Sequence, residues 1–361
     1  MIHPVTGQLP QERHQPFLGS AEWTTLILVL LTFAVPLMVS NPQVLSQTNL
    51  ILIGATAALG VYIMLRMDLM SFAVPAFMAI GGYTVAILGI RLGITNVIVL
   101  AIGAFVVPAL VAIPLGALIL RLKGVYFVLV TFVLTEILQL LLFEFASVTG
   151  GSNGLAGMPA ATFFGTELFD NSQVVLTTCG LSLAGFLVTA CFTRRFRYEF
   201  AAIEKNDILA ESLGLACWKY KAMAFSVAAG VSGLAGFALV NMLLTAHPTS
   251  FAPMSSVNYI TYVIVGGKGS ILGTLVGAAL LVSATNYFAM SGELSPGFFG
   301  LLIIVVTLLA RGGVVGVAGT LLQRLTSRNV QPLTSLPSTS ADLASDGAGS
   351  DNRPSAVGGR P

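Results

Sequence analysis

Ten apolar runs of membrane-spanning length divide the sequence, and they constrain its fold more than any other feature. A helix needs about 20 predominantly apolar residues to cross the hydrocarbon core of a bilayer. The runs therefore predict an all-α polytopic integral membrane protein with about 8–10 transmembrane helices. They cover approximately residues 23–40, 49–65, 69–90, 97–120, 124–143, 173–192, 222–245, 249–266, 269–290 and 296–310.

The run over 249–266 is the weakest of the ten. It contains Pro253 and several hydroxyl side chains. Proline removes a backbone hydrogen bond and usually kinks or breaks a helix. A half-helix or a re-entrant segment is therefore an alternative to a full span at this position.

A low charge content excludes most soluble functions. Charged residues make up 9% of the 361 residues, whereas an ordinary soluble domain carries about 25%. That share cannot supply the polar surface that a soluble protein of this size needs. We therefore exclude a soluble enzyme, a nucleic-acid-binding protein and a disordered protein, and we expect the chain to lie in a lipid bilayer.

The placement of Lys and Arg predicts the orientation in the membrane, because cytoplasmic segments of membrane proteins carry an excess of these residues. With the N-terminus in the cytoplasm, alternating spans place 16 of the 17 Lys and Arg residues inside and only Arg91 outside. Both termini are then cytoplasmic. The chain divides into a cytoplasmic N-terminal segment over 1–22, a transmembrane domain over 23–316 with a basic cytoplasmic loop at 193–221, and a disordered cytoplasmic tail over 326–361.

Glu136 is the most informative polar residue within a span. It lies slightly past the middle of the run over 124–143, with Gln139 on the same helix face and Thr131 nearby. A carboxylate at the bilayer centre costs roughly 2.5–3.5 kcal/mol or more, so it should face the interior and have a partner. Two interpretations stay open: Glu136 fixes helix packing through a hydrogen bond, or it lines a substrate pathway or binds a proton.

The sequence shows no catalytic constellation and no spacing of His residues that would bind a metal. The stretch from Gly266 to Ser270 superficially resembles a phosphate-binding loop. Tyr262, however, stands in the place of the first glycine of that motif, and Gly269 in the place of its final hydroxyl residue. We therefore expect the chain to bind no ATP and no other cofactor, so that any ATP dependence must come from a separate subunit.

The basic loop over 193–221 is the best candidate for binding a partner. Residues 199–213 are predicted to form one helix because their apolar residues recur at helical spacing, with Gly214 as its C-terminal stop. Such a helix could insert its apolar side into a groove on a cytosolic partner. The alternative is a solvated loop whose positive charge only sets the topology.

Six groups of residues, in a fixed order along the chain, carry a resemblance to a known family. They are Ser71 with Ala76-Phe77 and Gly81 to Thr84; Arg121 to Phe127 with Thr131 to Glu136; Thr149 to Leu155; Ala202 to Gly214 with Tyr220-Lys221; Phe225 to Gly236; and Val265 to Gly273, followed by a closing Arg311-Gly312.

In these segments the sequence resembles the LivM-type branched-chain amino acid permease subunits of ATP-driven (ABC) importers. The resemblance covers about residues 50–316. It departs from the family near Asp68, where glycine is usual, near Ala73-Val74, where a small-residue/His pair is usual, and near Glu204, where arginine is usual. These departures bear on the substrate rather than on the architecture.

The resemblance implies a division of labour between subunits. Residues 199–214 would form the coupling helix of a permease domain and dock on an ATPase subunit, so that ATP binding and hydrolysis rock this helix. Two ATP-binding cassette subunits and a homologous second permease subunit would complete the importer in a bacterial inner membrane. The residues implied for coupling are Ile203, Asn206, Asp207, Ala210, Glu211, Leu213 and Gly214.

The resemblance also implies that a periplasmic binding protein delivers substrate to the outside loop over 144–172. The substrates would be branched-chain amino acids or related small polar solutes such as urea and short amides, with Glu136, Gln139 and Thr131 lining the pathway. The loop's glycines permit positive φ, and its N–H groups could cradle a carboxylate, a plain turn being the alternative. The loop residues are Thr149, Gly150, Gly151, Ser152, Asn153 and Gly154.

A second class of function is an ion-coupled secondary transporter with Glu136 as its proton site. Such a protein alternates access between broken helices and needs no ATPase subunit. The match to the coupling helix favours the importer.

Overall fold

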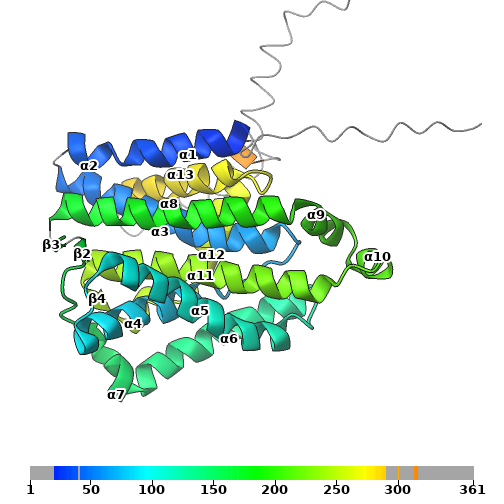
Figure 1. The fold of residues 1–361 in the computed structure, drawn as a ribbon, viewed down its shortest axis with the longest axis horizontal. Helices are drawn as coiled ribbons and strands as arrows, with labels where there is room; N and C mark the ends of the chain where they lie inside the picture. Colours follow the sequence, from blue (N-terminus) through cyan, green and yellow to red (C-terminus); the bar gives the residue numbers. More distant parts are fainter. Residues whose placement is uncertain are drawn as a thin grey trace, which may run out of the picture. The chain divides into compact units, whose positions relative to one another are not determined.

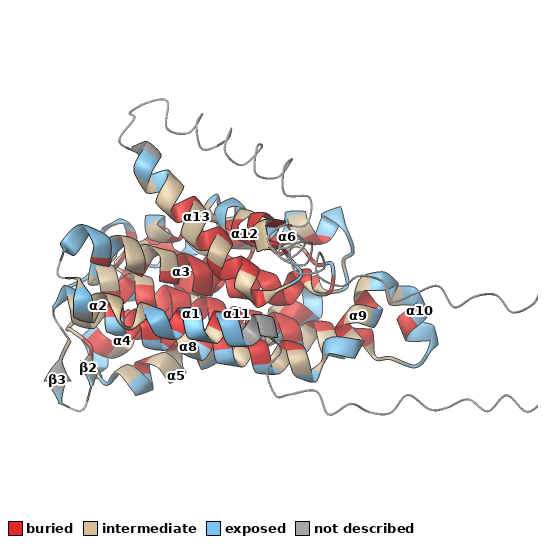
Figure 2. Cartoon of the chain, turned by 90° about the horizontal axis from the view of Figure 1, so that it is seen from above, coloured by how far each residue is buried: buried red, intermediate tan, exposed pale blue. Residues whose placement is uncertain are grey.

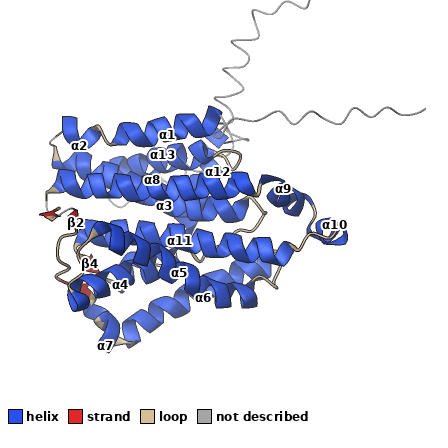
Figure 3. Ribbon diagram, in the orientation of Figure 1, coloured by secondary structure: helices blue, strands red, loops and turns tan. Residues whose placement is uncertain are grey.

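The computed structural model describes residues 20–39, 41–163, 165–168, 170–289, 300 and 313–315, all within one compact unit. Long helices run side by side through this part of the chain (Figure 1). Short strands and turns lie at one end of the bundle, and the short helices α9 and α10 lie at the other (Figure 3). Most of the segment over 1–22, nearly all of the run over 296–310 and the tail over 326–361 fall outside the described residues.

The elements follow one another in a simple order. The helices are α1 (Ser20–Thr32), α2 (Val35–Met38), α3 (Pro42–Leu65), α4 (Val74–Leu92), α5 (Val97–Ile119), α6 (Val125–Glu144), α7 (Ala146–Thr149), α8 (Asn171–Arg195), α9 (Arg197–Lys205), α10 (Asp207–Ser212), α11 (Cys217–Leu243), α12 (Ser255–Gly266) and α13 (Ile271–Ala289), with 3-10 turns η1 (Gly151–Asn153) and η2 (Pro248–Phe251). The strands β1 (Leu155–Ala156) and β4 (Thr245–Ala246) pair antiparallel, as do β2 (Thr162–Phe163) and β3 (Thr166–Glu167).

Six helices are long and apolar enough to cross a membrane, which confirms the predicted all-α polytopic fold. They are α3, α4, α5, α6, α8 and α11. The segments Pro248–Gly266 and Ile271–Tyr287 form a pair that is bent by 118°, and counting this pair as one span gives seven. These numbers refer to the described residues.

The expected full spans are wrong in two regions of the chain, 23–40 and 249–290. The run over 23–40 breaks after Thr32, and the 13-residue α1 is too short to cross a bilayer by itself. The runs over 249–266 and 269–290 are joined by a short turn at Gly267–Ser270 and together form the bent pair. The half-helix or re-entrant alternative for 249–266 therefore describes this region better than a full span.

Helix α11 occupies the centre of the bundle and packs against α3, α4, α5 and α8. The buried residues gather along this core (Figure 2). Small residues bring the backbones together: a Cβ atom at Gly81 of α4 would come within 2.5 Å of the Cα atom of Gly233 of α11. Close approach of this kind is the usual basis of helix association in lipid.

Helices α5 and α6 lie at the periphery. Only 22% of the most apolar window of each is buried, compared with 83% for α3. Their outward faces are nevertheless apolar, as lipid or a second membrane subunit requires.

The chain between α3 and α4 is not helical, and hydroxyl groups of neighbouring helices bind its backbone. The N–H of Phe72 donates to Thr131 Oγ1 at 3.1 Å, and the Phe72 carbonyl accepts from Thr135 Oγ1 at 3.0 Å and from Ser256 Oγ at 2.7 Å. Asp68, where the resemblance leads one to expect glycine, has φ of 57°. Glycine adopts this left-handed conformation without cost, and aspartate tolerates it.

Candidate functional site

Aromatic packing holds α9 against the bundle. Phe200 is fully buried, and its ring centroid lies 5.6 Å from that of Phe192 on α8. Phe196, between α8 and α9, lies 5.2 Å from Phe192 and 5.7 Å from Tyr220 on α11. Ile203 is 4% exposed and points to the same core. The apolar side of α9 therefore faces the protein itself.

The single helix expected over 199–213 is wrong. The backbone leaves the helical conformation at Asn206, where φ is −162° and ψ is 104°, so α9 ends at Lys205 and α10 begins at Asp207. The Asn206 side chain accepts a hydrogen bond from the Leu209 N–H at 3.0 Å and caps α10. An asparagine that binds nearby backbone in this way competes with continuation of the first helix.

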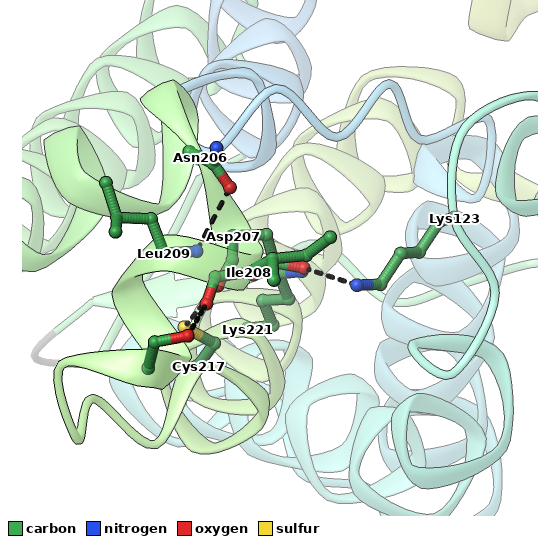
Figure 4. Close-up of polar contacts among 8 residues, drawn as sticks. Lys123, Asn206, Asp207, Ile208, Leu209, Cys217 and Lys221 are labelled. Carbon is green, nitrogen blue, oxygen red and sulfur yellow. Dashed lines mark hydrogen bonds and ion pairs between the residues drawn. The ribbon is translucent and has the colours of Figure 1, made fainter.

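Asp207 fastens α10 to two parts of the bundle (Figure 4). Its Oδ2 accepts from Lys221 Nζ of α11 at 2.7 Å and lies 3.1 Å from Lys123 Nζ in the turn between α5 and α6. The Lys221 side chain is 9% exposed, so this pair is largely removed from solvent. Burial alone would raise the pKa of the Asp207 carboxyl, but the two ammonium groups outweigh it and hold the pKa below its ordinary value.

A second ion pair fastens α9. Lys268 Nζ, in the turn between α12 and α13, lies 3.2 Å from Glu204 Oε1. Glu204 is one of the positions near which the sequence departs from the family pattern, and here its charge is matched by Lys268. Helices α9 and α10 are thus joined to the turn after α5, to α11 and to the turn after α12.

One face of α10 has no described partner. Ala210 is 4% exposed and packs inward, whereas Ile208, Leu209 and Leu213 are 69%, 57% and 80% exposed. Glu211 is exposed beside them. Contiguous exposed apolar side chains on an ordered helix mark a contact surface.

Gly214 ends α10 as the sequence predicts. Its φ is 89°, its N–H donates to the Glu211 carbonyl at 2.9 Å, and the Leu215 N–H donates to the Ala210 carbonyl at 3.0 Å. These two bonds form a Schellman motif, which requires the left-handed conformation that glycine favours. The turn into α11 is therefore fixed by the backbone.

Asp207, Glu211 and Cys217 place their possible ligand atoms within 4.8 Å of one another, the spacing that a divalent cation needs. The ammonium groups of Lys123 and Lys221 already neutralise Asp207 Oδ2. We assign no metal to this cluster.

The outside loop does not offer the carboxylate cradle that its sequence suggests. Its glycines do adopt positive φ, with values of 76°, 59° and 65° at Gly150, Gly151 and Gly154. Four N–H groups, however, already donate within the loop: Gly150 to Ala146, Gly151 to Thr149 Oγ1, Asn153 to Gly150, and Gly154 to Gly151. The plain-turn alternative describes this loop.

Contacts to other segments fix the loop in place. The Thr249 N–H donates to His247 Nδ1 at 3.2 Å, so the ring proton lies on Nε2, which donates to the Ser152 carbonyl at 2.9 Å. Arg91, the charge expected outside, donates to the carbonyls of Ser147 at 2.6 Å and Val148 at 3.0 Å.

The three pathway candidates on α6 have different surroundings. Thr131 is fully buried and binds Phe72, and Gln139 Nε2 donates to the Pro248 carbonyl at 3.2 Å. Glu136 is half-buried, and its carboxylate makes no hydrogen bond or ion pair with any described residue. The expectation that Glu136 faces the interior beside a partner is not met within this part of the chain.

Sequence reasoning missed a polar cavity of about 480 Å³ between α3, α12 and α13. Asn258 and Asn286 line it from α12 and α13, with Ser250 of η2 and Leu50 of α3. Two features of the sequence could have indicated this cavity: the polar residues of the weak run over 249–266 and the presence of Asn286 inside the next run. Periodicity could not bring the two runs together, because their 118° bend is a tertiary feature.

Comparison with known proteins gives consistent matches. The family model described as "Branched-chain amino acid transport system / permease component" matches residues 43–307. The High-affinity branched-chain amino acid transport system permease protein LivM of Salmonella typhimurium is 28% identical over 308 residues, which cover 78% of this chain and 72% of the relative. The protein of the same name from Escherichia coli is 28% identical over 306 residues, covering 77% and 71%. No solved structure matches.

Proposed function

The chain belongs to the permease component family of branched-chain amino acid transport systems, and on that premise we propose that it is a membrane-spanning subunit of an ATP-driven importer. Its substrates are branched-chain amino acids, which the names of both relatives specify, or related small polar solutes such as urea and short amides. Helices α9 and α10 dock the subunit on an ATP-binding subunit.

The exposed apolar face of α10 carries this proposal. Helices α9 and α10 lie together at one end of the bundle (Figure 1). Ile208, Leu209 and Leu213 are exposed there. Helix α10 is fixed in position by the ion pair of Asp207 with Lys221 and by the hydrogen-bonded turn at Gly214. A preorganised apolar helix face suits insertion into a groove, because its ordering cost has already been met within the subunit.

The ion pairs provide a route by which movement of α9 and α10 reaches the membrane. Asp207 connects them to α11 and to the start of α6 through Lys221 and Lys123, and Glu204 connects them to the α12–α13 turn through Lys268. ATP-driven displacement of the cytoplasmic helices would therefore pull on three membrane segments together.

The remaining partners follow from the same proposal. Two ATP-binding cassette subunits belong to the complex, and one of them binds the α9–α10 face of this chain. A periplasmic substrate-binding protein acts at the opposite end, where α7 and the strands lie. The membrane is the bacterial inner membrane with both termini in the cytoplasm, and this chain itself carries no cofactor. Lys205 ends α9, Lys123 pairs with Asp207 of α10, and Lys268 pairs with Glu204 of α9. These basic residues at the α9–α10 end support this orientation.

A homologous second permease subunit covers the outward faces of α5 and α6. Glu136 supports this placement, because a carboxylate within a span needs a partner and the described part of this chain supplies none. The partner group would then come from the second subunit.

The test replaces Leu213 by aspartate in the co-expressed complex, with Ser212→Asp as the matched control. Both changes add one carboxylate to the exposed end of α10, but only Leu213→Asp removes an apolar contact. We expect Leu213→Asp to lower co-purification of the ATP-binding subunits and ATP-dependent uptake at least about tenfold, because a charge then enters an apolar groove. Membrane insertion should be unchanged in both variants.

Unchanged uptake in Leu213→Asp would contradict the coupling role of α10. Uptake by the isolated chain under a proton gradient would instead favour the secondary transporter. In that case Glu136→Gln should abolish the pH dependence of uptake.

A further inference from the structure

The cavity between α3, α12 and α13 has the size of a small-molecule site. Its volume of about 480 Å³ falls within the range of roughly 300–1,000 Å³ that ligand pockets occupy. Leu239 of α11 lines it, 22 residues after Cys217 at the start of that helix. At 1.5 Å per residue, the cavity lies about 33 Å along α11 from the coupling end. It therefore lies nearer the end at which the binding protein would deliver substrate.

Unused polar groups face this cavity. The side-chain amides of Asn258 and Asn286 and the hydroxyls of Ser250 and Tyr259 make no hydrogen bond to any described residue. An asparagine amide offers two donors and an acceptor, and a hydroxyl offers both, so that together they can bind an ammonium group and a carboxylate. The described lining contains no charged side chain, which suits a ligand of zero net charge.

An apolar wall stands beside these groups. Leu50 and Ile53 of α3 and Val282 of α13 supply branched side chains. Gly54 of α3 has no side chain and so leaves room for the ring of Tyr262. A Cβ atom at residue 54 would lie only 3.1 Å from Tyr262 Cε2. One ligand that matches both walls has a zwitterionic head and a branched aliphatic side chain.

A larger apolar groove between α5 and α8 provides a contrast. Its volume is about 550 Å³, and its described lining is apolar except for Thr177, whose hydroxyl already donates to the Gln173 carbonyl at 3.0 Å. Transfer of a zwitterion into such a groove would leave its charges without partners, which costs several kcal/mol. Lipid chains suit that groove better than an amino acid does.

The walls of the polar cavity are also connected to the coupling helices. The turn between α12 and α13 carries Lys268, which pairs with Glu204 of α9. A displacement of α9 can thus change the angle between the two helices that bear Asn258 and Asn286. This connection places the cavity where ATP-driven movement can open or close it.

We propose that this cavity receives the transported branched-chain amino acid, with Asn258 and Asn286 binding its ammonium and carboxylate groups and Leu50, Ile53 and Val282 contacting its side chain. The inference rests on the proposed importer function and specifies which residues hold the substrate.

The experiment measures leucine uptake and ATP hydrolysis in proteoliposomes that contain the complete complex with leucine-loaded binding protein. Asn258→Leu and Asn286→Leu are compared with Thr261→Val, a polar-to-apolar change on α12 outside the cavity. We expect each Asn variant to lower the leucine transported per ATP hydrolysed about tenfold, the loss expected for one hydrogen bond to a charged group. Thr261→Val should remain near wild type.

A second variant tests the apolar wall. Its result can be read even if the Asn variants fail to assemble into the complex. Leu50→Phe narrows the cavity, whereas Val44→Phe enlarges an α3 side chain outside it. We expect Leu50→Phe to lower the ratio of leucine to alanine uptake about tenfold, since overpacking penalises the larger ligand more. Val44→Phe should leave this ratio unchanged.

The outcomes separate the two proposals. The cavity assignment would be overturned if all cavity variants kept the wild-type ratio of leucine to alanine uptake and the wild-type amount of leucine transported per ATP hydrolysed. The importer function would then still stand. Absence of ATP-dependent uptake by the wild-type complex with leucine, urea and short amides alike would overturn both.

Discussion

Asp207 is the residue on which the contacts of α10 with the bundle converge. Its carboxylate serves both Lys221, which is largely buried, and Lys123, which is 62% exposed. Exposed ion pairs contribute little to stability, whereas loss of one partner leaves a buried charge unpaired. The two lysines should therefore differ in importance although both touch the same oxygen.

We expect Asp207→Asn to weaken the attachment of α10 by about 1–2 kcal/mol, and Lys123→Met to have little effect. The double variant Asp207→Asn/Lys221→Met should recover much of the loss, because it removes the stranded ammonium group as well. Hydrogen–deuterium exchange of residues 206–215 measures the attachment. Equal effects of Asp207→Asn and Lys123→Met would show that burial of Lys221 is unimportant.

The same carboxylate gives a pH dependence whose sign follows from its pKa. The pKa of Asp207 in the folded chain is below its ordinary value of 3.8, so the ionised form contributes stability above about that pH. This contribution is lost as the pH falls through the folded-state pKa. Protection of residues 206–215, corrected for intrinsic exchange, should be level between about pH 8 and 5 and fall below about pH 4. Asp207→Asn should not show this fall.

At the scale of elements, hydroxyl groups of α6 and α12 bind the non-helical backbone that connects α3 to α4. Thr131 and Thr135 of α6 bind the N–H and the carbonyl of Phe72, and Ser256 of α12 binds the same carbonyl. Within a membrane such backbone is stable only when other protein groups satisfy it. The two threonines should therefore contribute unequally to stability. The Phe72 carbonyl has a second donor in Ser256, whereas Thr131 is the one acceptor described for the Phe72 N–H.

We expect Thr131→Val to destabilise the folded chain by about 1–3 kcal/mol, because it leaves the Phe72 N–H buried without an acceptor. Thr135→Val should cost less than about 1 kcal/mol, because Ser256 still donates to the carbonyl. Thermal unfolding in detergent compares two changes of identical chemistry on one helix. The reverse order would indicate that the Phe72 N–H has another acceptor.

At the scale of the whole molecule, the outward faces of α5 and α6 are apolar apart from Glu136 and a few other polar groups. Glu136 is the twelfth of the 20 residues of α6, about 17 Å from its start and thus near the middle of a span. An unpartnered carboxylate in that position disfavours the isolated subunit and favours an assembly that covers it.

Replacement of Glu136 by leucine should therefore raise the thermal stability of the isolated chain and weaken its association with the proposed second permease subunit. Glu136→Gln, which keeps hydrogen bonding but removes the charge, shows whether the partner group requires an anion. Differential scanning fluorimetry and co-purification provide the two measurements. A lower stability of isolated Glu136→Leu would place the partner of Glu136 within this chain.

Local chemistry in the sequence determined much of this protein. Long apolar runs require helices in a bilayer, because no water satisfies the backbone there, and the described spans follow those runs closely. The stop at Gly214 followed from the conformational freedom of glycine, and the apolar side of α9 followed from the spacing of Phe200 and Ile203. The expectation that this side enters a groove on a partner is wrong, because Phe200 and Ile203 are buried within the chain itself.

Only the tertiary structure decided the rest. Whether Asn206 caps a new helix or continues the old one depends on how Asp207 reaches Lys221, which lies 14 residues away. Whether loop N–H groups are free depends on acceptors that the folded loop supplies, as at Gly151 and Gly154. Asn258 and Asn286 face one cavity only because α12 and α13 bend at 118°. Periodicity specifies which face of a helix is apolar, but contacts between distant segments determine what that face meets.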